Sequence, residues 1–74
     1  MAAAEDHVAR IGQTAGLVWN ALHSGGAMSL SRLIKEIGRP RDEVMQAVGW
    51  LAREDKLTFQ DQGRTRKVAL KESG

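Results

Sequence analysis

The chain has 74 residues and no cysteine, so we expect one small domain without disulfides, a thiol nucleophile or a cysteine-based metal site. Its net charge of +2 is a weak basic excess, smaller than proteins that depend on phosphate contacts usually carry. No apolar run approaches the ~20 residues that cross a membrane, and MAAAEDHVARIG lacks the pattern of a signal peptide, so the expected location is the cytoplasm.

The first predicted helix starts at Ile11 and ends before the Ser24-Gly25-Gly26 segment, a strong helix stop. Its apolar residues recur at helical spacing: Ile11, Ala15, Val18 and Leu22. Residues 1–10 have no evident packing partner, and we expect them to form a frayed tail. Gly12 and Gly16 lie one turn apart inside this helix, where each costs about 1 kcal/mol relative to Ala. We interpret them as a notch for a bulky side chain or, alternatively, as a place of tight packing within the domain.

A second and a third helix follow a short strand at residues 27–29. Ser31 is the expected N-cap of the second helix and Gly38 its C-cap, and Pro40 suits the first turn of the third helix. The predicted buried side chains of the second helix are Leu30, Leu33, Ile34 and Ile37; those of the third are Val44, Val48 and Leu51, flanked by Ala47. Two helices joined by the tight turn at 38–40 indicate a helix-turn-helix.

The period then changes from helical to alternating. Leu57 and Phe59 are expected on one side of a strand, with Thr58 and Gln60 on the other. The segment 61–64 supplies turn residues, Val68 and Leu70 continue the alternation, and residues 72–74 form a polar tail. A lone hairpin is marginal in water, so this one must pack on the helices. The predicted fold is α+β: a single winged helix-turn-helix domain over residues 11–71, with three helices, a strand stub and a C-terminal two-stranded hairpin.

The sequence also resembles known proteins. MSLSRLIKEIGRPRDEVMQAVGWLAREDKLTF resembles the winged helix-turn-helix core of many bacterial regulators. IGQTAGLVWNAL together with VGWLAREDKL resembles a family of small, stand-alone winged-helix proteins from bacteria and archaea whose function is not established. The resemblance covers about Ile11 to Leu70. It implies that the third helix enters the major groove of double-stranded DNA in a role like that of a transcription regulator.

Candidate DNA-contacting residues lie on the third helix and near the C-terminus. On the helix, Gln46 suits adenine, while Arg41 and Arg53 suit guanine or phosphate; Asp42 and Glu43 are expected to face the phosphates and repel them. Residues 61–74 carry a charge of +2, from four basic and two acidic residues. The candidates for phosphate contact are Arg39 in the turn and Arg64, Arg66 and Lys67 in the hairpin, with Arg32 and Lys35 of the second helix as further ones. Plain solvation of these charges is an equally open interpretation.

Trp50 lies off the buried stripe of the third helix, and three interpretations of it stay open. It covers the edge of its own core, it fills a site on a second copy of the chain, or it stacks on a nucleic-acid base. The second interpretation, with the notch at Gly12 and Gly16, gives the alternative function: a homodimerisation module with little or no DNA binding.

The sequence shows no sign of catalysis. His7 and His23 have no metal-ligand spacing with each other or with carboxylates, and no serine belongs to a His–Asp constellation. We therefore expect no enzymatic activity, metal, cofactor or small-molecule ligand.

Overall fold

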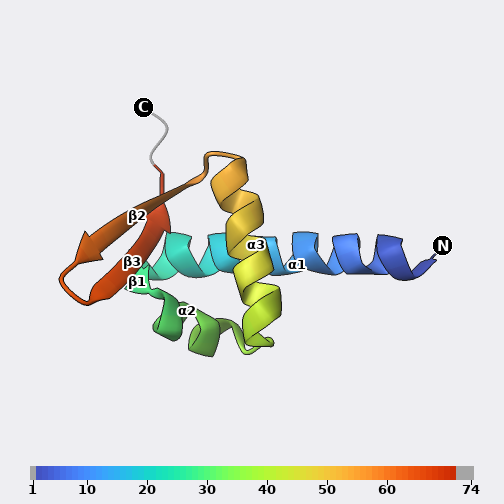
Figure 1. The fold of residues 1–74 in the computed structure, drawn as a ribbon, viewed down its shortest axis with the longest axis horizontal. Helices are drawn as coiled ribbons and strands as arrows, with labels where there is room; N and C mark the ends of the chain where they lie inside the picture. Colours follow the sequence, from blue (N-terminus) through green and yellow to red (C-terminus); the bar gives the residue numbers. More distant parts are fainter. Residues whose placement is uncertain (1, 72–74) are drawn as a thin grey trace.

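The computed structural model describes the backbone of residues 2–71 and the side chains of residues 6–61 and 63–71. Three helices and three strands follow one another along the chain (Figure 1). In order they are α1 (Ala2–Gly25), β1 (Met28–Ser29), α2 (Leu30–Ile37), α3 (Arg41–Arg53), β2 (Leu57–Gln62) and β3 (Thr65–Leu70). The predicted α+β class, with a strand stub and a C-terminal hairpin, is confirmed.

The three strands form one antiparallel sheet in the order β1-β3-β2. Leu57 lies opposite Leu70 and Phe59 opposite Val68, while Met28 of the stub pairs with Val68 from the other side. Lys71 donates its backbone N–H to the carbonyl of Lys56 at 2.8 Å, which closes the base of the hairpin. The stub therefore gives the hairpin the third strand that it needs for stability.

The core lies where α1, α3 and the base of the sheet meet. Figure 1 shows α3 crossing α1, with the hairpin extending to the other side of α3 from the N-terminus. The buried apolar residues include most of the predicted stripes: Ala15, Val18, Leu22, Met28, Leu33, Val44, Ala47, Val48, Leu51, Leu57 and Val68. Leu30, Ile34, Ile37 and Leu70 are partly buried against them. Phe59 shares the inward side of the sheet but is 45% exposed, because the hairpin reaches beyond the helices.

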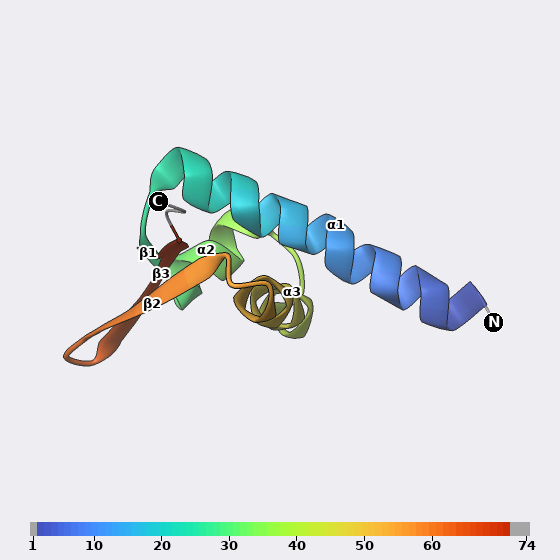
Figure 2. The ribbon, with the colours of Figure 1, turned by 90° about the horizontal axis from the view of Figure 1, so that it is seen from above.

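The first helix is longer than the sequence indicated. It starts at Ala2, so residues 2–10, which we expected to be a frayed tail, form its first turns, and the N-terminal end of α1 extends beyond the other elements (Figure 2). The physical reason is composition: this segment holds no Gly or Pro and is rich in Ala. It also has acidic residues near its start, which stabilise the helix through the positive N-terminal end of its macrodipole. Residues 1 and 72–74 lie outside the described part of the chain.

The cap positions differ from two predictions. The N-cap of α2 is Ser29, whose Oγ accepts a hydrogen bond from the backbone N–H of Arg32 at 3.2 Å, and not Ser31. A serine hydroxyl reaches the N–H three residues later, so the helix start at Leu30 selects Ser29. Pro40 is the N-cap of α3, where its carbonyl accepts from the N–H of Val44. Gly38 ends α2 as predicted, with a φ of 72°.

Candidate nucleic-acid interface

The second helix of the helix-turn-helix, α3, has one face in the core and the opposite face in solvent. Val44, Ala47, Val48 and Leu51 anchor the buried face in the core. Because the helix repeats every 3.6 residues, burying that stripe turns a second set of side chains outward. The exposed residues opposite the stripe are Asp42, Met45, Gln46, Gly49 and Arg53. The predicted candidates Gln46 and Arg53 thus share one open surface, which we call the outer face, and the exposed Arg41 borders it at the start of the helix.

Glu43 does not lie on this surface, contrary to the expectation that it faces the phosphates. Its side chain is only 12% exposed and points at α1, where the hydroxyl of Thr14 donates to Oε2 at 2.9 Å. Two guanidinium groups complete the cluster. Arg39 approaches Oε2 at 3.2 Å and Arg10 approaches Oε1 at 3.7 Å. Glu43, Ala47, Trp50 and Glu54 occur on one side of α3, and packing of α1 against that side explains why the carboxylate turns inward.

The cluster keeps the Glu43 carboxylate charged. Partial burial alone raises the pKa of Glu43. The hydrogen bonds from Thr14 and Arg39, and then the positive charges of Arg39 and Arg10, lower it and prevail. The pKa of Glu43 therefore lies below its ordinary value of 4.5. Arg39, a predicted phosphate contact, is occupied in this cluster by its ion pair with Glu43.

Asp42 remains on the outer face. Its Oδ1 accepts a hydrogen bond from the backbone N–H of Glu43 at 3.0 Å, so it helps to satisfy the first turn of α3. Arg41 precedes it and makes no ion pair within the described residues. The start of the outer face thus carries one exposed acid and one exposed base, in place of the two acids that the sequence suggested.

The hairpin carries its basic residues around its tip. Arg66 pairs with Asp61 across the two strands at 2.9 Å, and that partner raises the pKa of Arg66. Arg64 is exposed in the turn and has no ion-pair partner in the part of the chain that the structure describes. Lys67 is half-buried opposite Ser29 of β1. A shallow hollow joins the hairpin to the start of α2, lined by Ser29, Leu30, Ser31, Arg64, Thr65 and Arg66.

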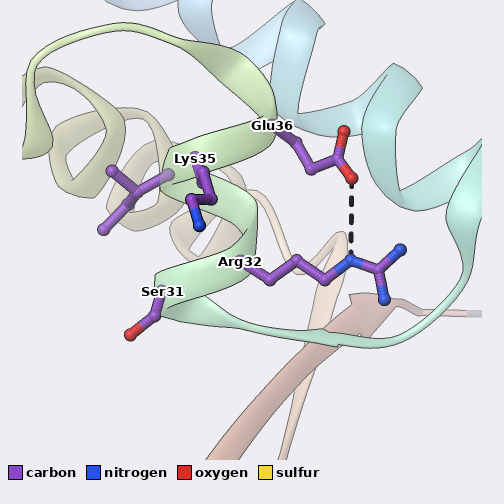
Figure 3. A pocket seen from close by; sticks show the side chains of 5 residues that line it. Ser31, Arg32, Lys35 and Glu36 are labelled. Carbon is purple, nitrogen blue, oxygen red and sulfur yellow. Dashed lines mark ion pairs between the residues drawn. The ribbon is translucent and has the colours of Figure 1, made fainter.

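The two basic residues of α2 differ in their surroundings. Arg32 pairs with Glu36 one turn later at 3.6 Å, and Figure 3 shows the two side chains lying together on one side of the helix. Lys35 points away from that pair. Lys35 has no ion-pair partner within the described residues, so its positive charge is more available than that of Arg32.

Trp50 lies between α3 and the N-terminal turns of α1. It is 43% exposed and lines an open hollow with His7 and Ile11 of α1. A Cβ placed on Gly12 or on Gly16 meets no atom within 4 Å, so the notch is empty and Trp50 of the same chain does not fill it. The three predicted interface residues therefore do not form one contact within the chain. A separate exposed aromatic group exists on α1, where Trp19 stacks on His23 at 4.7 Å.

The sequence prediction missed Thr14 and Arg10. Thr14 is fully buried, and it precedes Ala15 and lies one turn before Val18 in the apolar stripe. A polar side chain on the buried side of a helix needs a hydrogen-bond partner, and this was the available signal. Arg10 lay in the segment predicted to be a tail, so no signal connected it with Glu43.

A helix-turn-helix with an exposed second helix, followed by a hairpin that packs on the core, defines the winged helix-turn-helix class of proteins. The family model described as "Winged helix-turn-helix domain (DUF2582)" matches residues 4–70, and the chain belongs to this family. The predicted resemblance to small winged-helix proteins is thereby confirmed.

Two further comparisons agree with this assignment. "Uncharacterized protein MJ1608" of Methanocaldococcus jannaschii is 43% identical over 56 residues, which are 72% of this chain and 79% of that protein. The solution NMR structure of protein BT2368 from Bacteroides thetaiotaomicron superposes with a TM-score of 0.75 and 30% identity, covering 82% of this chain and 74% of that one.

Two features of the described residues bear on other functions. Within the described residues, no three His, Cys, Asp or Glu side chains come together as a metal site. Among the helices described above, none is long and apolar enough to cross a membrane.

Proposed function

We propose that the chain binds double-stranded DNA through the outer face of α3 and the tip of the β2–β3 hairpin, in a non-enzymatic role like that of a transcription regulator. The observation that carries the proposal is the inward turn of Glu43. It removes one negative charge from the side of α3 that enters the major groove in this class and leaves Arg41, Gln46 and Arg53 exposed. Membership of a winged helix-turn-helix family supports it.

The exposed residues divide into two roles. Gln46 pairs with adenine and Arg53 with guanine, while Met45 offers an apolar surface to a thymine methyl group. Arg41 and Arg64, which have no ion-pair partner among the described residues, contact phosphates and fix the position of the duplex. Arg66 and Lys67 contribute less, since Arg66 is paired with Asp61 and Lys67 is half-buried.

The test is the salt dependence of duplex binding, measured by fluorescence anisotropy with mixed-sequence DNA. For each phosphate contact that is lost, the slope of log K against log salt falls by about 1 in magnitude. Arg64→Ala should show this smaller slope and weaker binding at low salt. Lys56→Ala, which removes one exposed positive charge from the opposite end of the hairpin, is the matched control and should keep the wild-type slope.

Two results would contradict DNA binding at this surface. The first is no anisotropy change at low salt with folded protein. The second is an equal loss of slope in Arg64→Ala and Lys56→Ala, because it would show that only the net charge matters.

A second candidate function, homodimerisation, is favoured by a different surface. Val8 and Trp19 are exposed at 52% and 40% on the side of α1 that carries the empty notch at Gly12 and Gly16. Two copies of α1 crossing at the notch would bury these apolar groups. Sedimentation equilibrium tests this: Val8→Glu should yield monomers from a wild-type dimer. Leu17→Glu, on the far side of the helix and also exposed, should leave the mass unchanged. A monomeric wild type at high concentration would exclude this function.

A further inference from the structure

The hollow beside Trp50 has walls from two elements that are far apart in the sequence. The N-terminal turns of α1 supply His7 and Ile11, and α3 with its C-cap supplies the rest of the lining: Gln46, Gly49, Trp50, Arg53 and Glu54. It is an open hollow of about 630 Å³. A Cβ on Gly49 would meet no atom within 4 Å, so the hollow is open above the backbone at Gly49.

The polar groups around the indole offer both donors and acceptors. The Arg53 guanidinium only donates hydrogen bonds, the Glu54 carboxylate only accepts them, and the Gln46 amide does both. Within the described residues, Arg53 and Glu54 form no ion pair, so neither group is already occupied by a charged partner. Glu43, the other acid on this side of α3, is engaged with Thr14 and the two arginines and adds no free negative charge to the hollow.

A flat ring that stacks on an indole, accepts from a guanidinium and donates to a carboxylate fits this set. Guanine has these features on one planar, fused ring system: O6 and N7 accept, and N1–H and the N2 amino group donate side by side to a single carboxylate. Adenine has no N1–H and no N2 amino group, so it would leave the Glu54 carboxylate with fewer partners. Stacking of a base on an aromatic side chain is by itself tolerant of sequence, so the polar groups decide between bases.

We propose that this hollow binds the guanine ring of a free guanine mononucleotide, stacked on Trp50 and paired with Arg53 and Glu54. The structure thereby gives a role to an aromatic side chain that packing covers only in part. Gln46 and Arg53 belong both to the hollow and to the outer face of α3. A bound nucleotide therefore competes with duplex DNA; this consequence alone rests on the proposed function, whereas binding of the nucleotide does not.

The experiment is an NMR titration of the labelled full chain with GMP, IMP and AMP in the absence of DNA. GMP should shift the indole N–H of Trp50 and the amide of Gly49 in a saturable way, while the indole of Trp19 stays unchanged as the internal control. IMP lacks only the N2 amino group and should bind about tenfold more weakly, because part of the carboxylate is left unpaired. AMP should bind more weakly still.

Variants connect the preference to named groups. Glu54→Gln should lose the preference for GMP over AMP, and Trp50→Leu should lose saturable binding of all three nucleotides. Trp19→Leu is the matched aromatic control and should bind GMP like the wild type; amide spectra show that each variant is folded. Equal affinity for GMP and AMP, an unchanged preference in Glu54→Gln, or no shift at Trp50 would each overturn the proposal.

Two further measurements are needed. One distinguishes a free nucleotide from a guanine within a nucleic acid, and the other distinguishes this proposal from the proposed DNA binding. A single-stranded oligothymidine with one central guanine, bound far more tightly than GMP, would overturn the assignment to a free nucleotide. Anisotropy with duplex DNA, repeated with saturating GMP, should show a higher apparent Kd. If DNA does not bind at all, the GMP titration still decides the nucleotide site. If DNA binds and GMP causes no shift, only this inference fails.

Discussion

Gly12 and Gly16 lie on a side of α1 where an added methyl group would meet no atom within 4 Å. Glycine inside a helix costs about 1 kcal/mol relative to alanine because its backbone loses more freedom on folding. Gly12→Ala and Gly16→Ala should therefore each stabilise the monomer by about 1 kcal/mol and raise the Tm by about 4–8 °C. Thermal unfolding followed by circular dichroism at low protein concentration measures this.

The control for these substitutions is Gly38→Ala, because Gly38 has a φ of 72° and also open space around it. A residue with a Cβ is strained in this left-handed conformation, so the same chemical change should lower the Tm. A fall in Tm for Gly12→Ala or Gly16→Ala would contradict the open space at the notch and would indicate that a close neighbour, such as a second copy of the chain, needs the glycine.

At the residue scale, the apolar stripes could be predicted but the direction of Glu43 could not. Val18 and Leu22 of α1 recur at helical spacing, as do Val44, Val48 and Leu51 of α3. This repeat alone identifies the buried side of each helix. Glu43 lies at the edge of the stripe of α3, where position on the helix permits either solvent or a neighbouring helix. Its inward direction depends on Thr14 and Arg10, which α1 brings to it from about 30 positions away in the chain.

At the element scale, the start of α2 offers a sharp test of the cap. Ser29 accepts a hydrogen bond from the N–H of Arg32, whereas Ser31 lies exposed inside the first turn. Replacing a serine N-cap by alanine costs about 1 kcal/mol, so Ser29→Ala should lower the Tm by about 4–8 °C. Ser31→Ala, the matched control, should change it little. Thermal unfolding of both variants measures the difference, and equal stability of the two would show that the cap assignment is wrong.

Periodicity predicted which helices and strands exist better than it predicted where they begin and end. The change from a period near 3.6 to a period of 2 after Leu51 separates α3 from the hairpin, and the turn residues at 61–64 set its register. The start of α1 was missed because residues 2–10 carry no apolar stripe: Val8 is exposed. That segment is helical through composition, which a search for periodicity does not detect.

At the scale of the whole molecule, one carboxylate connects three parts of the fold. Glu43 on α3 accepts from Thr14 of α1, and it pairs with Arg10 of α1 and with Arg39 in the turn after α2. These contacts fix how α1 crosses α3, and so they fix the direction in which the outer face of α3 points. The overall class could be predicted because each element has its own sequence signal, whereas the assembled face depends on contacts between elements.

The same cluster predicts how stability depends on pH. The pKa of Glu43 is lowered in the folded chain, so the folded state binds fewer protons than the unfolded state as the pH falls below the ordinary value of 4.5. The stabilisation by Glu43 is therefore fully present above that pH and is lost as the pH falls through the folded pKa. Glu43→Gln removes the titrating group while it keeps the shape of the side chain.

The measurement is the urea midpoint of wild type and Glu43→Gln from pH 7 to pH 2.5. Wild type should be the more stable at pH 7, and the gap should close in the acid range as the native carboxylate becomes protonated. Asp42→Asn is the control on the neighbouring position, because it also removes one carboxylate from the first turn of α3 but Asp42 is exposed and outside the cluster with the arginines. A gap for Glu43→Gln that is constant down to pH 2.5 would mean that the carboxylate charge does not hold α1 to α3.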